Sequence, residues 1–250
     1  MATPSIAGLE LNELKWWSNW AHVKRLGTRA YMLTSDLFQE PFFNRACFVG
    51  CGAVSAHREK AEKEFRRLGL PPTMTVNRSC SSALRMLAES GYHPTETMSV
   101  MVATRRTETT NPAYADVRET SAGSVSEWTK AYLLSFYGDV TLTHAVTKVA
   151  QRLLRSRSAT LLEARLDGAV AGVLAIYRTQ GLAGIYCVGT VPKFRRKGVA
   201  GTLLQRTSEI ASSEGRRMIL QTLRSDGAEA FYAKRGFAAL YHKSFMGKET

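Results

Sequence analysis

The stretch VGTVPKFRRKGVAGTLL, residues 188–204, decides how the rest of this sequence is interpreted. It starts at the end of an apolar segment with strand character and runs into an amphipathic helical pattern. Basic side chains at Lys193 and 195–197 precede the small residues Gly198 and 200–201. Small side chains let an anion approach the backbone, and a helix N-terminus offers unpaired N–H groups and a favourable dipole. The stretch therefore predicts a pyrophosphate-binding loop, whereas a solvated basic turn would explain only its charge.

The pattern on either side of this loop alternates between helix and strand. The expected order is helices at 125–137 and 140–154, strands at 159–166, 169–177 and 183–191, the loop with its helix, a strand at 218–223, a helix ending at 235, and a strand at 237–246. Asp167-Gly168 supplies the positive φ angles of a two-residue hairpin turn. Ser225 or Asp226 is expected to cap the last helix, and Gly236 to end it.

The first half of the chain repeats part of this pattern at an offset of about 145 residues, obtained by aligning the two halves. Gly91-Tyr92 falls on Gly236-Phe237, and Met101 falls on Met246. With the same offset, a helix at 58–68 falls on 203–213 and a strand at 73–76 on 218–221. The shared order of these matches favours a duplicated half over coincidence.

Two motifs resemble those of the GNAT N-acetyltransferases. Arg195-x-x-Gly198-x-Ala200 resembles the family's Q/R-x-x-G-x-G/A loop, and 231–237, which contains Tyr232, resembles its later motif. The resemblance covers residues 115–246 and, through the repeat, extends to a degenerate copy at about 8–103. It implies an α/β (α+β) fold of two tandem domains, each with a central mixed, mostly antiparallel twisted sheet flanked by helices. The expected division is a degenerate, non-catalytic domain at 1–107, a linker with a first strand at 108–124, and a catalytic domain at 125–250.

The resemblance also implies that acetyl-CoA is the acyl donor and that a primary amine attacks it directly. The cofactor-binding residues it implies are Val188, Gly189 and Thr190 for the pantetheine arm, Arg195, Arg196, Lys197, Gly198, Val199, Ala200 and Gly201 for the pyrophosphate, and Ser225 and Tyr232 beyond the loop. Ser225 stands where the family commonly has Asn, so the sequence departs from the family's pattern at this contact. No metal is expected.

Amide formation requires two proton transfers. An amine with a pKa near 10 must lose a proton before it attacks, and the departing thiolate benefits from gaining one. Tyr232 occupies the place where the family keeps the Tyr that protonates the thiolate, so the resemblance implies that it is catalytic. The base stays open between a chain of waters and five side chains. These are Glu127, Asp139, His144, Glu163 and Asp226.

The acceptor is expected to be an amine-bearing small molecule or polypeptide, and the sequence does not say which. The aromatic side chains of the helix at 125–137 are the candidates for contacts with it, with core packing as the alternative. They are Trp128, Tyr132, Phe136 and Tyr137. In the first half, Gly50 replaces Arg195 and Leu87 replaces Tyr232, which is why that copy is expected to be non-catalytic.

The charge of the chain leaves a different class of function open. The net charge is +13 over 250 residues, and residues 121–250 carry 19 basic and 9 acidic side chains. Such an excess is typical of nucleic-acid or ribosome binding as well as of polyphosphate binding. A CoA-binding sensor is a third hypothesis, because no base is evident. The oligomeric state stays open, with a monomer among the options.

Cysteine content and the N-terminal sequence indicate a compartment. Four cysteines, Cys47, Cys51, Cys80 and Cys187, are too few for a disulfide framework in a chain of this size, so reduced and mostly buried thiols are expected. The N-terminus has no basic and apolar signal pattern, and no apolar run reaches the roughly 18 residues that a membrane span needs. The prediction is a cytoplasmic protein without membrane contact.

Overall fold

A computed structural model describes residues 4–107 and 115–248, and the chain divides into two compact units. The loop unit comprises residues 102–220 and 231–238 and contains the basic loop. The N-terminal unit comprises residues 2–101, 221–230 and 239–250. Two segments of the second half, 221–230 and 239–250, thus group with the first half, and the expected division into domains stays a prediction.

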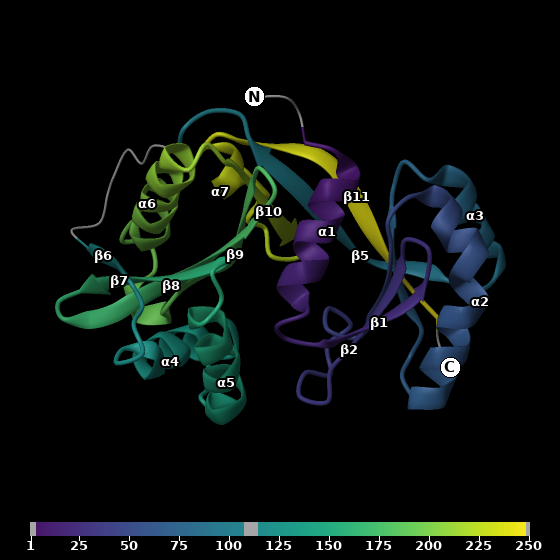
Figure 1. Ribbon diagram of the computed structural model, residues 1–250, viewed down its shortest axis with the longest axis horizontal. Coiled ribbons are helices and arrows are strands. Elements are labelled where there is room, and N and C mark those ends of the chain that lie inside the picture. Colours follow the sequence, from purple (N-terminus) through teal and green to yellow (C-terminus); the bar gives the residue numbers. More distant parts are fainter. Residues whose placement is uncertain (1–3, 108–114, 249–250) are drawn as a thin grey trace. The chain divides into compact units, whose positions relative to one another are not determined.

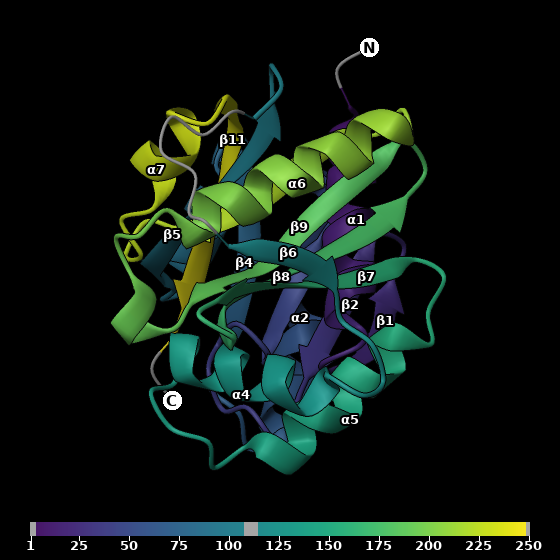
Figure 2. The ribbon, with the colours of Figure 1, turned by 90° about the vertical axis from the view of Figure 1, so that its left-hand side faces the viewer.

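The loop unit is a five-stranded arrangement covered by helices on both faces. Its elements are β6 (Asp116–Glu119), α4 (Val125–Phe136), α5 (Thr143–Leu154), β7 (Ala159–Leu166), β8 (Ala169–Thr179), β9 (Leu182–Thr190), a 3₁₀ turn (Pro192–Phe194), α6 (Val199–Ser213) and β10 (Arg217–Leu223). The strand order is β10-β9-β8-β7-β6. The β9–β10 pair is parallel and the other pairs are antiparallel. Helix α6 lies on one face, and α4 and α5 lie on the other (Figures 1 and 2).

Local chemistry explains most of these boundaries. Asp167 and Gly168 have φ of +51° and +78°, the conformation expected for the hairpin that joins β7 to β8. Because helices cover both faces, every residue from Ala171 to Ile176 of β8 is buried, with no alternation. The predicted helices and strands of this unit are present, with ends that shift by a few residues.

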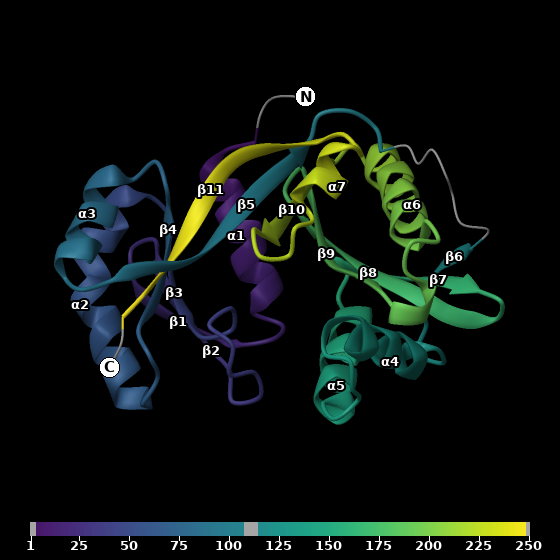
Figure 3. The same cartoon turned by 180° about the vertical axis from the view of Figure 1, so that it is seen from behind.

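The N-terminal unit has the same kind of layered architecture. Its elements are α1 (Ile6–Trp17), β1 (His22–Gly27), β2 (Ala30–Thr34), β3 (Arg45–Phe48), α2 (Cys51–Leu68), β4 (Thr73–Asn77), α3 (Ser81–Glu89), β5 (His93–Ala103) and β11 (Phe237–Gly247). The strand order is β1-β2-β3-β4-β11-β5. Helices α2 and α3 lie on one face of these strands and α1 on the other (Figure 3). The predicted fold class, a mixed and mostly antiparallel sheet flanked by helices, is confirmed.

The last strand of the chain completes the N-terminal unit. β11 pairs antiparallel with β4, from Lys243 opposite Asn77 to Gly247 opposite Thr73. This pairing joins segments about 170 residues apart in sequence, which the local pattern could not predict.

The two halves share an order of elements. The run α2-β4-α3-β5 in the first half corresponds to α6-β10-α7-β11 in the second, where α7 spans Glu229–Ala233. Helices α2 and α6 end at Leu68 and Ser213, which are related by the offset found in the sequence. Gly91 and Gly236, related by the same offset, have φ of +85° and +88°. This correspondence supports the interpretation of a duplicated half.

Two expectations were wrong. Helix α7 begins at Glu229, and 224–227 form a turn, so neither Ser225 nor Asp226 caps it. The carboxylate of Asp226 instead accepts a hydrogen bond from the N–H of Leu223, which stabilises this turn. The four thiols are also not all reduced. Cys51 and Cys80 form a disulfide, whereas Cys47 and Cys187 are free.

The described residues contain neither a metal-ligand cluster nor a membrane-spanning helix. Within 4–107 and 115–248, no group of three or more His, Cys, Asp or Glu side chains is placed to hold a metal ion. In the same part of the chain, no helix combines the length and the apolar character that crossing a bilayer requires.

Candidate functional site

Strand β9 carries a bulge at the position predicted for ligand contact. Val173 of β8 pairs with Gly189, but Ala175 pairs with Tyr186, so two residues of β9 face one residue of β8. Within this bulge Cys187 has φ of +53°, a conformation that costs a non-glycine residue roughly 1–3 kcal/mol. Bulges bend a strand and redirect its backbone groups. Val188, Gly189 and Thr190 therefore lie in and just after a bent segment.

The same segment extends past the paired part of the neighbouring strand. The parallel pairing of β9 with β10 runs from Leu182 opposite Arg217 to Ile185 opposite Leu220. Residues 186–190 of β9 continue beyond the last of these pairs. A strand edge of this kind can form main-chain hydrogen bonds with an extended ligand.

Two glycines hold helices close to this edge. A Cβ on Gly189 would lie 2.8 Å from Ser135 Cβ and 2.9 Å from Phe136 Cε2, at the end of α4. A Cβ on Gly172 would lie 2.6 Å from Val199 Cγ1, at the start of α6. At contacts this short, a side chain at either position would force the neighbouring atoms to shift. The end of α4 and the first turn of α6 therefore pack directly on the strands.

The basic loop leads into α6 without a side-chain cap. Arg196 and Gly198 have φ of +63° and +83°, and Gly198 is the N-cap residue of α6. No side chain accepts a hydrogen bond from the first turn at this cap. The first N–H groups of any α-helix lack partners within the helix, so this turn presents donors to a ligand.

The charged side chains of the loop are held around that turn. The guanidinium of Arg195 donates to Thr190 O at 3.3 Å and to Ser135 O at 3.1 Å, which joins the loop to the ends of β9 and α4. Lys193 and Lys197 lie 4.8 and 5.6 Å from the centre of the buried Phe194 ring, within cation–π distance. Ser135 was not singled out in the sequence, because nothing in its surroundings marks a carbonyl acceptor.

The candidate catalytic tyrosine is part of the loop unit. Tyr232 lies in α7 and is 9% exposed. Its ring packs edge-to-face against Phe231 at 5.2 Å and Phe237 at 6.0 Å between centroids. Phe231 of α7 and Phe237 of β11 thus hold the ring, and the catalytic role of Tyr232 stays a prediction.

Ser225 has a different environment. It lies in the exposed turn 224–227, which falls in the N-terminal unit. Burial would raise the pKa of Glu96, but hydrogen bonds from Ser225 and from the N–H of Thr97 lower it. The Ser225 hydroxyl therefore already has a carboxylate partner, and its contact with a cofactor stays a prediction.

The four candidate acceptor contacts divide into core and surface. Trp128 is fully buried and its indole N–H donates to Leu162 O at 3.1 Å. Tyr132 stacks on that ring at 5.6 Å and is 7% exposed. Phe136 is 51% exposed, and Tyr137 is half-buried. Phe136 and Tyr137 are thus the members of the set with ring surface available to a ligand.

Two of the candidate bases are counterions of arginines. Glu163 is fully buried and accepts from the Nε atoms of Arg118 and Arg165, each at 2.9 Å. Glu127 forms an ion pair with the same Arg165. Both carboxylates therefore already have guanidinium partners, and a role of either one as the base stays a prediction.

The other three candidates differ in exposure and pKa. His144 is exposed. The pKa of Asp139 is lowered by hydrogen bonds from the backbone and side chain of Thr141. The pKa of Asp226 is raised by partial desolvation of its carboxyl group and by the nearby charge of Glu96, although the residue lies in an exposed turn. Asp226 belongs to the N-terminal unit, so its role stays a prediction.

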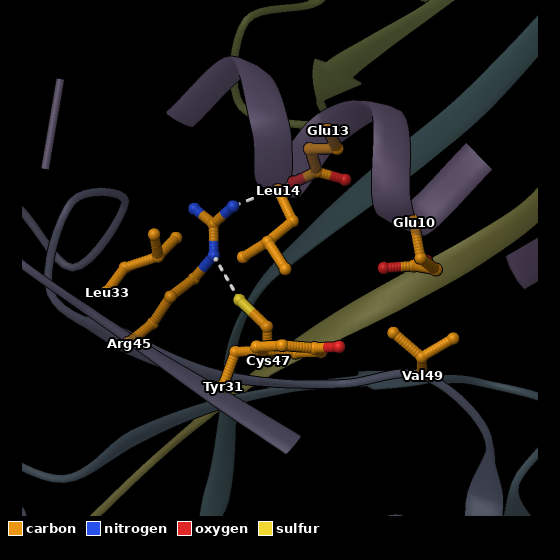
Figure 4. A pocket seen from close by; sticks show the side chains of 8 residues that line it. All are labelled: Glu10, Glu13, Leu14, Tyr31, Leu33, Arg45, Cys47 and Val49. Carbon is orange, nitrogen blue, oxygen red and sulfur yellow. Dashed lines mark hydrogen bonds and ion pairs between the residues drawn. The ribbon is translucent and has the colours of Figure 1, made fainter. Parts of the chain in front are cut away.

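A small pocket in the N-terminal unit contains buried charges that neutralise one another. It is lined by Glu10, Glu13, Leu14, Tyr31, Leu33, Arg45, Cys47 and Val49 (Figure 4). Arg45 donates to Glu13 at 2.7 Å and to the Cys47 sulfur at 3.3 Å. Lys243 of β11 bonds to both Glu10 and Glu13. Because two carboxylates face two cations, the pocket offers no unbalanced charge to a ligand.

Comparison with known proteins finds one family match within the chain and several similar folds. Residues 124–237 match the model of the "Acetyltransferase (GNAT) family". A GCN5-related N-acetyltransferase from Kribbella flavida has a similar structure, with 15% identity, a TM-score of 0.73, and coverage of 100% of this chain and 97% of that one. Another, from Sphaerobacter thermophilus, has 16% identity, a TM-score of 0.70, and coverage of 98% and 90%.

At these identities the solved structures establish the fold alone, and no curated protein matches the sequence. The family model covers α4 to the start of β11, which includes the bulged strand, the basic loop and Tyr232. Residues 124–237 of this chain therefore contain a match to the GNAT family of acetyltransferases.

Proposed function

We propose that this protein is an N-acetyltransferase that uses acetyl-CoA as acyl donor and a primary amine as acceptor. The observation that carries the proposal is the continuous path from the bulged edge of β9 to the uncapped N-terminus of α6, with basic side chains beside it. Structural neighbours that are acetyltransferases support the fold on which this path is built.

The loop fits the pyrophosphate of the donor. Gly198 is the N-cap residue of α6 at φ of +83°, and no side chain caps the N–H groups of the first turn. The side chains of Arg196 and Lys197 are exposed, which leaves their charge available to a phosphate. Arg195 instead holds the loop against Thr190 and Ser135. Two roles are therefore proposed for the basic residues. Arg195 positions the loop, and Arg196 and Lys197 bind the pyrophosphate.

The edge of β9 fits the pantetheine arm, which carries amide groups. Val188 and Thr190 lie past the last residue of β9 that pairs with β10, so this edge can add main-chain hydrogen bonds to the ligand. Gly189 allows α4 to approach, and the exposed ring of Phe136 lies beside it. This arrangement supports Phe136 as an acceptor or cofactor contact.

The acyl group supplied by the thioester is proposed to pass directly to the amine. Burial raises the pKa of the Cys187 thiol well above its usual value, so the cysteine at the bulge stays protonated and is a poor nucleophile. Tyr232 is the proposed donor of a proton to the departing thiolate. The acceptor is proposed to be an amine on a small molecule or polypeptide.

Thermal unfolding with and without acetyl-CoA tests the proposal. A ligand at 100 times its Kd stabilises the folded state by about 2.7 kcal/mol, which raises Tm by roughly 5–10 °C in a chain of this size. Gly198→Glu should remove the shift, because it places a carboxylate at the phosphate position. Gly198→Ala is the matched control, because it carries the same backbone strain at positive φ without the charge.

Two results would contradict the proposal. Absence of any shift for the wild-type protein at millimolar acetyl-CoA would exclude donor binding. Equal loss of the shift in the Ala and Glu variants would show that backbone strain, rather than phosphate repulsion, explains the effect. Binding of RNA instead, with an affinity that falls steeply as the salt concentration increases, would favour the alternative of a nucleic-acid-binding protein.

A further inference from the structure

The disulfide of the N-terminal unit joins the N-termini of two helices. Cys51 is the first residue of α2, which has 18 residues, and Cys80 is the N-cap of α3, which has 9. Their Cα atoms are 5.2 Å apart, and the bond spans 29 residues of sequence. Neither helix has a side-chain hydrogen bond at its N-cap. Both sulfur atoms therefore lie where the positive ends of helix dipoles are not neutralised by a capping side chain.

This placement favours the reduced form of the pair. A helix N-terminus stabilises a thiolate and lowers the pKa of the thiol. A disulfide carries no charge and gains little from the same dipoles. A thiol of low pKa is also a better leaving group in exchange with another thiol. A bond between two such sulfurs is therefore easier to reduce than one between two cysteines in strands.

Exposure makes the two sulfurs unequal. Cys51 is exposed, whereas Cys80 is 4% exposed. An incoming thiolate can reach Cys51, and Cys80 is then the leaving group at the start of α3. The free Cys47 lies on β3, where its sulfur accepts a hydrogen bond from Arg45. Cys47 is therefore not at a helix N-terminus as Cys51 and Cys80 are.

The repeat relates the two disulfide cysteines to two residues of the second half, one of them in the basic loop. At the offset of the repeat, Cys51 falls on Arg196 and Cys80 falls on Ser225. In the loop unit this is the start of the basic loop, whereas residues 47–56 contain no basic side chain. A covalent bond thus stands in the N-terminal unit where the second half has its phosphate-binding loop.

We propose that Cys51–Cys80 is a reversible thiol–disulfide exchange site whose substrate is a small thiol of the glutathione class. A thiolate attacks the Cys51 sulfur and forms a mixed disulfide, while the Cys51–Cys80 bond breaks and Cys80 leaves as a thiolate. A second thiolate attacks the sulfur of the small thiol, which releases Cys51 as a thiolate. The two cysteines are reduced, two small thiols are oxidised to their disulfide, and the cysteine thiolates equilibrate with protons of the solvent.

Alkylation and mass spectrometry of the native protein test this site. The folded, oxidised protein is incubated with millimolar reduced glutathione and then with N-ethylmaleimide. Labels are expected on both Cys51 and Cys80, and removal of the reductant under oxidised glutathione should restore the bond. Hydrogen exchange should become faster at the starts of α2 and α3 after reduction, while the strands of the loop unit keep their rates.

Single-cysteine variants test the order of attack. Cys80→Ser should accumulate glutathione on Cys51 when treated with oxidised glutathione, and Cys51→Ser should carry roughly tenfold less on the buried Cys80. Cys47→Ser is the matched control and should exchange like the wild type. The measurements on the wild-type chain stand by themselves if a variant does not fold.

Three outcomes would overturn the inference. The bond could resist glutathione until denaturant is added, which would make it a permanent cross-link. Both cysteines of the untreated protein could react with N-ethylmaleimide, which would show that no bond forms. Glutathione could attach mainly to Cys80, which would reverse the order of attack. None of these depends on acetyl-CoA binding, so this test and that of the proposed function can fail separately.

Discussion

Single residues of the loop unit combine strain and charge at one place. Cys187, Arg196 and Gly198 all have positive φ within twelve residues of sequence, and two of them are not glycine. Strained backbone of this kind persists where the surrounding structure holds it, and it concentrates at functional sites. The strain on β9 and in the loop is thus a second, independent indication of the site that the basic residues suggested.

Replacing Tyr232 by Phe tests its proposed role as a proton donor. The ring packs between Phe231 and Phe237, so the variant should fold and keep the thermal shift with acetyl-CoA. Loss of a general acid typically slows a reaction by 10²–10⁴, so kcat should fall by about that factor while KM for acetyl-CoA changes little. Steady-state kinetics would measure both. Normal turnover would exclude Tyr232 as the acid.

The buried charges of the N-terminal unit predict a dependence of stability on pH. Burial alone would raise the pKa of Glu13, but the attraction of Lys243 and Arg45 lowers it below the usual 4.5. A carboxyl group with a lowered folded-state pKa stabilises the fold above its unfolded pKa and loses that contribution as pH falls. Denaturant unfolding should therefore show a decrease in the free energy of unfolding as pH falls below about 4.5.

Two variants separate this effect from general acid unfolding. Glu13→Gln should reduce the decrease in acid and should cost about 3–5 kcal/mol at neutral pH, because it leaves buried cations short of a partner. Glu10→Gln should keep the decrease in acid. Burial raises the pKa of Glu10, so the contribution of Glu10 to the free energy of unfolding increases, rather than decreases, as pH falls. An unchanged acid profile in Glu13→Gln would rule out this assignment.

At the scale of elements, packing of α4 against β9 shapes the site. Gly189→Ala would place a methyl group 2.8–2.9 Å from Ser135 Cβ and Phe136 Cε2. Such overpacking typically costs 1–3 kcal/mol, and it should also weaken acetyl-CoA binding by displacing the end of α4. The exposed Gly123, whose nearest neighbour is a side-chain oxygen 3.7 Å away, is the matched control. If the Gly189→Ala and Gly123→Ala variants had similar thermal stability, the close packing of α4 on Gly189 would not contribute to stability as predicted.

Element boundaries were predictable where a local signal sets them. The hairpin at Asp167-Gly168 and the end of α7 before Gly236 follow from positive φ angles that few residues adopt. The start of α7 was not predictable in this way. Ser225 and Asp226 are residue types that commonly cap helices. Here the Ser225 side chain forms a hydrogen bond with Glu96, and the Asp226 carboxylate accepts one from the N–H of Leu223 in the turn after β10. A tertiary partner thus replaced the local one.

At the scale of the whole molecule, the two halves of the sequence are not the two units of the structure. β11 belongs mainly to the N-terminal unit, where it pairs with β4. A fragment of residues 115–250 should therefore lack the partner of its last strand and expose that strand's edge, which promotes aggregation. Size-exclusion chromatography and thermal unfolding should show aggregates or no cooperative transition. A monomeric, cooperatively folding fragment would show that β11 has another stable position.

The sequence by itself determined the family motifs, the bulk of the helices and strands, and the basic loop before α6. These features depend on chemistry within a few residues of one another: apolar periodicity, glycine at positive φ, and charge next to small side chains. The repeat was also visible, because an offset preserves local patterns.

Only the tertiary structure decided the partners that lie far apart in sequence. Nothing around Cys51 or Cys80 indicated that they meet, and the reduced thiols expected there were wrong. Lys243 looked like an ordinary strand residue, yet it lies 230 residues from its partner Glu13 and is 3% exposed. The free energy of a buried charge or a strand edge depends on what faces it, and what faces it is set by the whole fold.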